Sequence, residues 1–297
     1  MASWQFRVMW AVLAGRLRRQ TAVRLHEDLA VTRRSMEKLG ARARLPAGCR
    51  AESATIGSLA AEWVIPAEAA DGRAILYLHG GAYCLGSARS HRFLGGYVAR
   101  AAQRRVLLPD YRLSPEHPFP AAVDDTVAAY RWLLATGYKP ENLTIMGDSA
   151  GGGLALAALV ALRDAGERLP GTAVCLSPWA DLAGTGDSMT GKRQADALLS
   201  PELLARYARW YADGRDLTHP LISPLYASLA GLPRLLIQVG ENEILLDDAT
   251  RLAARARTDG VDVTLEVWPD MVHVWHALAA LIPEGRQAIG RIGEFIS

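Results

Sequence analysis

The stretch Gly147-Asp148-Ser149-Ala150-Gly151 stands between the apolar run Leu143–Met146 and a long alanine- and leucine-rich segment, Gly152–Ala165. An apolar run followed by such a segment predicts a strand that turns sharply into a helix. The flanking glycines permit a strained backbone and close packing of the strand against the helix. A turn of this kind exposes its middle residue, which here is Ser149. The pattern therefore predicts a nucleophilic serine.

A glycine-rich loop lies upstream, where the apolar run Ala74–Leu78 ends in His79-Gly80-Gly81-Ala82-Tyr83. Hydrolysis of an ester passes through a tetrahedral oxyanion, and backbone N–H groups fixed in advance stabilise that charge. We expect Gly80, Gly81 and Ala82 to be such donors, together with Ala150 at the start of the helix after Ser149. The alternative, an ordinary Gly-Gly turn, is disfavoured by the separate serine motif.

A serine hydroxyl becomes a good nucleophile when a base takes its proton and an acid orients that base. Only three histidines, at positions 219, 273 and 276, follow Ser149. His273 comes shortly after the apolar run Val263–Val267, which predicts the last strand, so it is expected on a loop above the sheet. We expect His276 to pack or cap, and His219 to lie at the surface. His273 is the predicted base.

The acid is expected on the loop after the preceding strand, predicted at Arg234–Val239. That loop contains Glu243. Asp247 is the alternative, but it falls in the first turn of the next helix, where acids commonly serve the helix dipole. Either acid type is found in such triads, and Glu243 is the predicted one.

Four ordered motifs together resemble those of the hormone-sensitive-lipase-like branch of the α/β-hydrolases, the bacterial family IV esterases. They are His79-Gly80-Gly81, the proline-rich segment Asp110–Ala122, Gly147-Asp148-Ser149-Ala150-Gly151-Gly152, and Ser177-Pro178-Trp179-Ala180-Asp181-Leu182. The resemblance spans nearly the whole chain. It implies that Ser149 is the nucleophile, that His273 is the base, and that Gly80 and Gly81 belong to the oxyanion hole. Two departures are Glu243-Ile244-Leu245, where the family usually has Asp-x-Leu, and Ala82, which replaces a third glycine.

The order of apolar runs predicts an α/β fold with a mostly parallel central sheet flanked by helices. Besides the strands above, we expect strands at Val106–Pro109 and Ala173–Leu176, and an antiparallel edge formed by Ala51–Ile56 and Ala60–Ile65. The chain is read as a single α/β-hydrolase domain, residues 1–297. By resemblance, residues 1–47 and 183–216, approximately, form a helical cap over the site.

The proline-rich segment Asp110–Ala122 is expected to have a structural role. Its prolines stop regular structure, and Asp110, Arg112 and Glu116 are expected to form a partly buried ion-pair network. Asp148 is likewise read as a support for the serine turn.

Composition limits the functional classes. Half of the 297 residues are hydrophobic, enough for one large core, and a net charge of +2 argues against nucleic-acid binding. Three cysteines, an odd count without close spacing, predict no disulfide framework and a reducing, cytoplasmic compartment. We expect no metal site, no cofactor and no integral membrane span, and read the short apolar stretch Val8–Ala14 as part of an amphipathic helix.

The sequence thus predicts hydrolysis of short-to-medium-chain carboxylic esters through an acyl-enzyme on Ser149. The expected partner is a small-molecule ester. Two alternatives stay open: a lactone or terpenoid-ester hydrolase with the same machinery, and a catalytically silent small-molecule receptor. A homodimer, paired through an edge strand, is a further expectation that the resemblance raises.

Overall fold

The computed structural model describes residues 2–297, and its strands there form one sheet in the order β1-β2-β4-β3-β5-β6-β7-β8. The strands are β1 (Cys49–Ile56), β2 (Leu59–Pro66), β3 (Ala74–Leu78), β4 (Arg105–Pro109), β5 (Leu143–Asp148), β6 (Thr172–Leu176), β7 (Arg234–Gly240) and β8 (Val263–Trp268). Pairing is antiparallel from β1 to β2 and from β2 to β4, and parallel everywhere else. The mostly parallel sheet and its antiparallel edge are both as predicted.

The helices come between the strands and before them. They are α1 (Trp4–Arg24), α2 (Leu29–Arg42), α3 (Ala88–Ala102), α4 (Ala121–Ala135), α5 (Ala150–Asp164), α6 (Ser188–Gly191), α7 (Pro201–Ala212), α8 (Leu246–Thr258) and α9 (Pro283–Ile296). Helices α4, α5 and α8 share one hydrophobic core with the sheet, and α3 and α9 share a second core on its other side. This is the two-sided covering that a parallel sheet requires.

The burial of the central strands explains why the sequence predicts their positions. Every residue of β3 and β5 is buried. A strand covered on both faces reads as a continuous apolar run and not as an alternating one. The alternation of such runs with helical segments therefore identified the α/β class without any long-range information.

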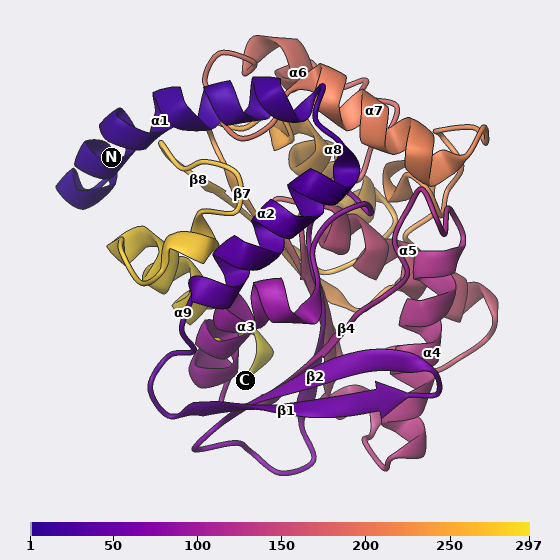
Figure 1. Ribbon diagram of the computed structural model, residues 1–297. Coiled ribbons are helices and arrows are strands. Elements are labelled where there is room, and N and C mark those ends of the chain that lie inside the picture. The colour runs from indigo at the N-terminus through magenta and orange to yellow at the C-terminus, as the bar shows by residue number, and fades with distance from the viewer. Residues whose placement is uncertain (1) are drawn as a thin grey trace.

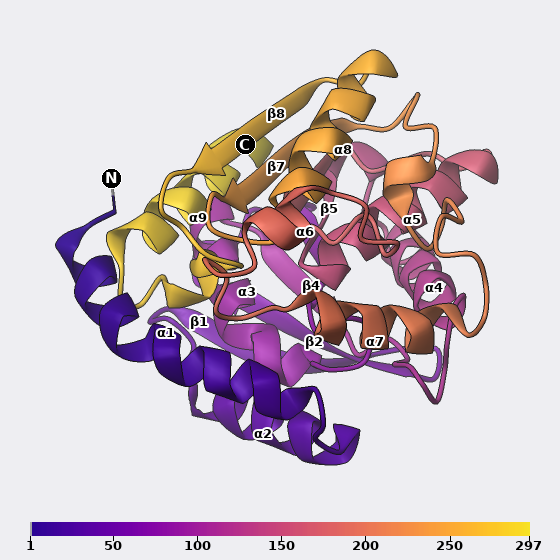
Figure 2. The same ribbon diagram turned by 90° about the horizontal axis from the view of Figure 1, so that it is seen from above.

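Helices α1, α6 and α7 lie along the top of the view in Figure 1, and α2 descends from the end of α1. Helix α7 also contributes buried residues to the core that α4, α5 and α8 share. Viewed from above, α1 lies beside α2 and continues towards α7 (Figure 2). Contacts between segments distant in the sequence tie this group together: the Thr21 hydroxyl donates to the carbonyls of Ala197 and Leu198, and the Arg206 guanidinium donates to the carbonyls of Arg24 and Leu25. The two segments expected to form a cap are therefore joined to each other.

The first half of α1 packs elsewhere, on the chain that follows β8. Phe6 and Ala2 are buried in a small cluster with Met271, Val272 and Trp275. The helix thus runs from the loop that carries His273 to the segment around residue 197. No helix among residues 2–297 is long and apolar enough to cross a membrane.

The expected ion-pair network within the proline-rich segment is wrong. Arg112 pairs with Asp125 on α4, Glu116 pairs with Arg33 on α2, and Asp110 accepts a hydrogen bond from the backbone of Ala88 at the start of α3. The three side chains thus bond to groups on three different helices, α4, α2 and α3. The segment therefore joins neighbouring elements instead of closing on itself.

Candidate active site

Ser149 occupies the sharp turn between β5 and α5. The residue is only 8% exposed, so the expectation that the turn exposes it to solvent is wrong. Its backbone has φ 55° and ψ −123°, a region that residues other than glycine rarely adopt. A Cβ atom added at Gly151 would lie 2.0 Å from the Leu78 carbonyl oxygen, and one at Gly147 would lie 2.3 Å from the Gly151 backbone. The two glycines are thus required by close packing, as the sequence pattern predicts.

The three predicted triad residues form one chain of hydrogen bonds. His273 Nε2 lies 2.9 Å from Ser149 Oγ, and His273 Nδ1 lies 2.7 Å from Glu243 Oε2. Both distances are within the range that proton transfer and orientation of a base require. Each residue follows the carboxyl end of a different parallel strand, β5, β7 or β8, which is why three distant positions meet at one edge of the sheet.

The second oxygen of Glu243 is also fixed. Glu243 Oε1 accepts hydrogen bonds from Ser177 Oγ at 2.9 Å and from the Gly240 amide at 2.6 Å. The Ser177 hydroxyl in turn accepts from the Val274 amide at 3.1 Å, next to His273. Glu243 itself is fully buried. The carboxylate is therefore held by both oxygens, with one of them left to orient the imidazole.

Two opposing effects act on the pKa of His273. Burial lowers the pKa of its imidazole, but the hydrogen bond and charge of Glu243, aided by the charges of Asp196 and Asp148, outweigh burial and raise it above the usual value. An imidazole with a raised pKa takes up a proton more readily than a free imidazole does.

The glycine-rich loop differs from its prediction at one position. The Gly80 amide donates to Asp148 Oδ1 at 3.1 Å in a buried contact, so it is not free to stabilise an oxyanion. The expectation that Gly80 is an oxyanion donor is therefore wrong, because its N–H already donates a hydrogen bond to the Asp148 carboxylate. Across the described chain, the amides of Gly81, Ala82 and Ala150 donate to no acceptor. Ala82 has φ 54° and Gly81 φ 121°, so the loop turns through a conformation that frees its amides.

Asp148 joins the two halves of this arrangement. Besides the Gly80 amide, its Oδ1 accepts from the Tyr77 hydroxyl at 2.8 Å, and its Oδ2 lies 3.7 Å from His91 Nε2. The residue therefore supports the serine turn and ties it to the glycine-rich loop, as the sequence reading expects.

These features fit one enzyme family. A family profile described as the alpha/beta hydrolase fold matches residues 75–277. An acetyl-hydrolase of Streptomyces hygroscopicus is 54% identical over 242 residues, which cover 82% of this chain and 81% of the relative. An esterase of Acinetobacter venetianus is 39% identical over 232 residues, covering 78% and 77%. The crystal structure of an esterase from the bacterial hormone-sensitive lipase family superposes with a TM-score of 0.90 at 49% identity, covering 95% of this chain and 96% of that one. The chain belongs to the hormone-sensitive lipase family of esterases.

The other candidate residues of this esterase lie in different environments. Asp247 Oδ2 accepts from the Ser188 amide at 2.8 Å, in the first turn of α8. His276 is fully buried, bonds Gln238 through Nε2, and has its pKa lowered to about 3 by burial and by His273. His219 is exposed. None of the three is part of the hydrogen-bonded chain at Ser149.

Two residues of this site escaped the sequence reading. Ser177, with φ 45°, begins the Ser177–Leu182 motif on which the family resemblance partly rests. The sequence therefore indicated that this position matters, but it did not predict the contact with Glu243. Asp196 had no sequence signal. It is 3% exposed, and its Oδ2 accepts from the Ile244 amide at 3.0 Å, directly after Glu243. Burial raises the pKa of Asp196, and the charge of His273 opposes that rise.

A groove of about 580 Å³ lies between α1 and residues 193–202. Arg18, Thr21 and Leu25 line it on the α1 side, and Asp196 lines it on the other. Ser149 is not among its lining residues. The groove meets the candidate site only through Asp196. Among residues 2–297 no cluster of histidine, cysteine, aspartate or glutamate could hold a metal ion.

Proposed function

We propose that this esterase hydrolyses short-to-medium-chain carboxylic esters through an acyl-enzyme on Ser149. The observation that carries the proposal is the unbroken hydrogen-bonded chain from Ser149 through His273 to Glu243. The name acetyl-hydrolase, given to the 54% identical relative, supports the short end of that range.

The proposed reaction uses the groups of this chain in two steps. Ser149 Oγ bonds to the ester carbonyl carbon while its proton passes to His273 Nε2. Free amides of Gly81, Ala82 and Ala150 are the proposed donors to the resulting oxyanion. The C–O bond to the alcohol then breaks, and His273 returns the proton to the leaving oxygen. Water, deprotonated by His273, attacks the acyl-enzyme and releases the acid with Ser149 regenerated.

The helical segments around residues 1–47 and 183–216 are proposed to form the cap that selects substrates. Support comes from their connection to each other and to the catalytic loops: α1 packs on the chain that carries His273, and Asp196 bonds the residue after Glu243. The homodimer and the cytoplasmic location both stay predictions. Sedimentation analysis and localisation of a tagged chain would test them.

The test is hydrolysis of p-nitrophenyl esters from acetyl to palmitoyl by wild type, Ser149→Ala and a matched control, Ser58→Ala, in the exposed β1–β2 turn. Circular dichroism checks the fold of each. We expect activity on short chains that disappears only in Ser149→Ala. Hydrolysis that survives in Ser149→Ala would refute the assignment of the nucleophile. A folded wild type that cleaves none of the esters would refute the substrate class and favour the lactone or receptor alternatives.

A further inference from the structure

Helix α1 does not separate an apolar face from a polar one, so the expectation of an amphipathic helix around Val8–Ala14 is wrong. The helix is apolar on two sides, and the protein covers only one of them. The inner side, with Phe6, packs against the chain after β8. On the outer side Trp4 is 66% exposed, Val8 60% and Val12 75%. Residues four apart lie along one face of a helix, so these three side chains form a continuous apolar line facing solvent.

The charged residues of α1 border the same outer side. The helix contains five arginines and no acidic residue. At 3.6 residues per turn, Arg7 falls on one flank of the apolar line and Arg16 on the other, and Arg19 continues it towards the C-terminal end. All three side chains are exposed. We call Trp4, Val8, Val12, Arg7, Arg16 and Arg19 the α1 outer face.

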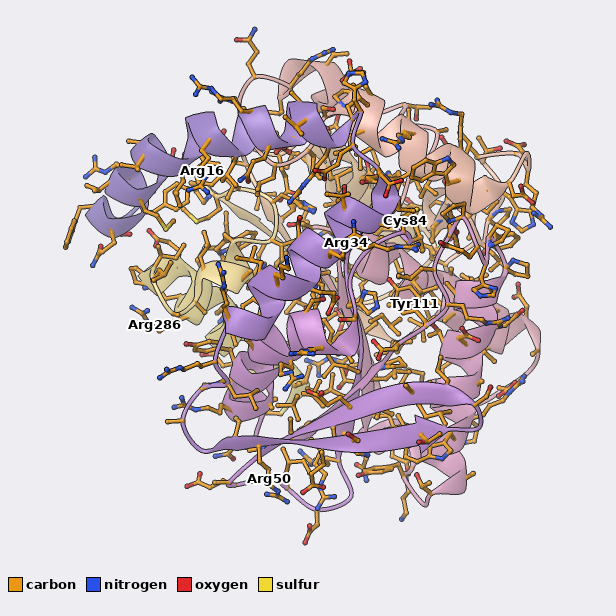
Figure 3. All side chains as sticks on the ribbon, in the orientation of Figure 1. Arg16, Arg34, Arg50, Cys84, Tyr111 and Arg286 are labelled. Atoms are coloured by element: carbon orange, nitrogen blue, oxygen red, sulfur yellow. The ribbon has the colours of Figure 1, made fainter. Side chains whose placement is uncertain are left out.

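The positive charge of the chain is concentrated in the N-terminal segment that contains α1 and α2. The first 47 residues contain ten basic and three acidic side chains, although the complete chain has a net charge of only +2, so the remaining residues are net acidic. Helix α2, which lies beside α1 in Figures 1 and 2, adds exposed Arg34 and Lys38, and an exposed Leu39. Arg16 and Arg34, labelled in Figure 3, come from these two neighbouring helices, whereas Arg50 lies towards the opposite end of the molecule on β1.

We propose that the α1 outer face binds the surface of an anionic phospholipid membrane, with the helix lying in the plane of the interface. A helix with an apolar line bordered by arginines, and with tryptophan among the apolar residues, can bury that line at the headgroup boundary while its guanidinium groups meet phosphates. Long arginine side chains reach from the flanks to the charged surface. The binding requires no membrane span and does not depend on the esterase reaction.

A second copy of this chain is a poorer occupant of the same face. Pairing two α1 outer faces would bring arginines of both copies together, and α1 offers no acidic side chain to neutralise them. An anionic surface supplies the missing negative charge. Charge complementarity thus favours the lipid surface.

The experiment measures sedimentation of the full chain with vesicles of phosphatidylcholine alone and of phosphatidylcholine mixed with phosphatidylglycerol. We expect strong binding to the anionic vesicles only, weakened by added salt. The variant W4S/V8S/V12S removes the apolar line, and R7Q/R16Q/R19Q removes the charges. Each arginine near an anionic surface favours binding roughly fivefold, so the second variant should bind on the order of 100-fold more weakly.

Matched controls carry the same types of change elsewhere. V267S/L281S replaces exposed apolar residues, and R50Q/R131Q/R168Q removes three exposed arginine charges. Both should bind vesicles like the wild type, and circular dichroism checks that every variant is folded. Absence of vesicle binding, or equal loss in the controls, would overturn the proposal. So would a dimer that W4S/V8S/V12S dissociates, because a second copy would then cover the face.

Discussion

Replacing Glu243 with glutamine tests the proposed role of the acid, because glutamine keeps the size of the side chain and loses one acceptor. In the wild type both oxygens accept hydrogen bonds: Oε1 from Ser177 Oγ and the Gly240 amide, and Oε2 from His273 Nδ1. Glutamine has one oxygen and one NH₂ group for these three donors. The buried Gly240 N–H cannot accept, so the amide oxygen should take the Oε1 position and turn the NH₂ group towards His273.

An NH₂ group facing Nδ1 selects the wrong tautomer of the imidazole. Nδ1 must then accept, so the ring proton moves to Nε2, which faces Ser149 Oγ and can no longer take its proton. Loss of the correct tautomer in a serine triad costs about 10⁴-fold in kcat. At 1.36 kcal/mol for each tenfold change, that equals about 5.5 kcal/mol of transition-state stabilisation.

The assay is hydrolysis of p-nitrophenyl acetate by wild type, Glu243→Gln and Asp247→Asn, with the fold checked by circular dichroism. Asp247 is the matched control because it is a nearby acid that accepts a hydrogen bond from the Ser188 amide and none from His273. We expect Asp247→Asn to keep kcat within about threefold of the wild type. A loss below about tenfold in Glu243→Gln would refute the tautomer argument. A large loss in Asp247→Asn alone would move the acid to that position.

Three further predictions concern titration and stability. The pKa of His273 is raised, and only the neutral imidazole accepts a proton, so kcat/KM should fall on acidification with a midpoint above pH 6.5. A pH profile of p-nitrophenyl acetate hydrolysis measures this midpoint. A midpoint below pH 6.5 would contradict the raised pKa. Asp196→Asn removes a negative charge that raises the pKa of His273, so the same limb should move to lower pH, and an unchanged limb would show that Asp196 does not influence the base. Tyr111→Phe removes the buried hydroxyl that donates to the His79 carbonyl at 2.7 Å, and urea denaturation should show a loss of about 1–3 kcal/mol in the free energy of unfolding; an unchanged midpoint would count against the contact.

The sequence was informative wherever a residue's environment is set by its own strand and the loop that follows. Glu243 follows β7, which is buried along most of its length, and His273 follows β8, an edge strand whose apolar residues alternate with Thr264 and Glu266. Parallel strands bring their carboxyl ends together, so both loops reach the same edge of the sheet. The serine turn was equally clear, because Gly147 and Gly151 approach each other within the turn: a Cβ atom at Gly147 would lie 2.3 Å from the Gly151 backbone.

Contacts between distant segments were beyond such reasoning. Gly80 was predicted as an oxyanion donor together with its neighbours, but its amide donates a hydrogen bond to Asp148, which lies 68 positions away. Arg112 and Glu116 find partners on α4 and α2 and not on their own segment. Asp196 lies in a stretch with no regular periodicity, so its burial beside the acid loop could not be read from neighbouring residues.

The hydrogen bonds between the 183–216 segment and the Ile244 backbone have a consequence for protein engineering. Asp196 accepts from the Ile244 amide, and the Ser188 hydroxyl donates to the Ile244 carbonyl at 2.7 Å, so both backbone groups of this residue are held from outside its own loop. A chimera that imports this segment, part of the proposed cap, from a relative also replaces the groups that hold the residue after Glu243, the proposed triad acid. The natural unit of exchange is therefore the segment together with residues 243–247. A graft that separates them would remove the two hydrogen bonds that hold the backbone next to Glu243.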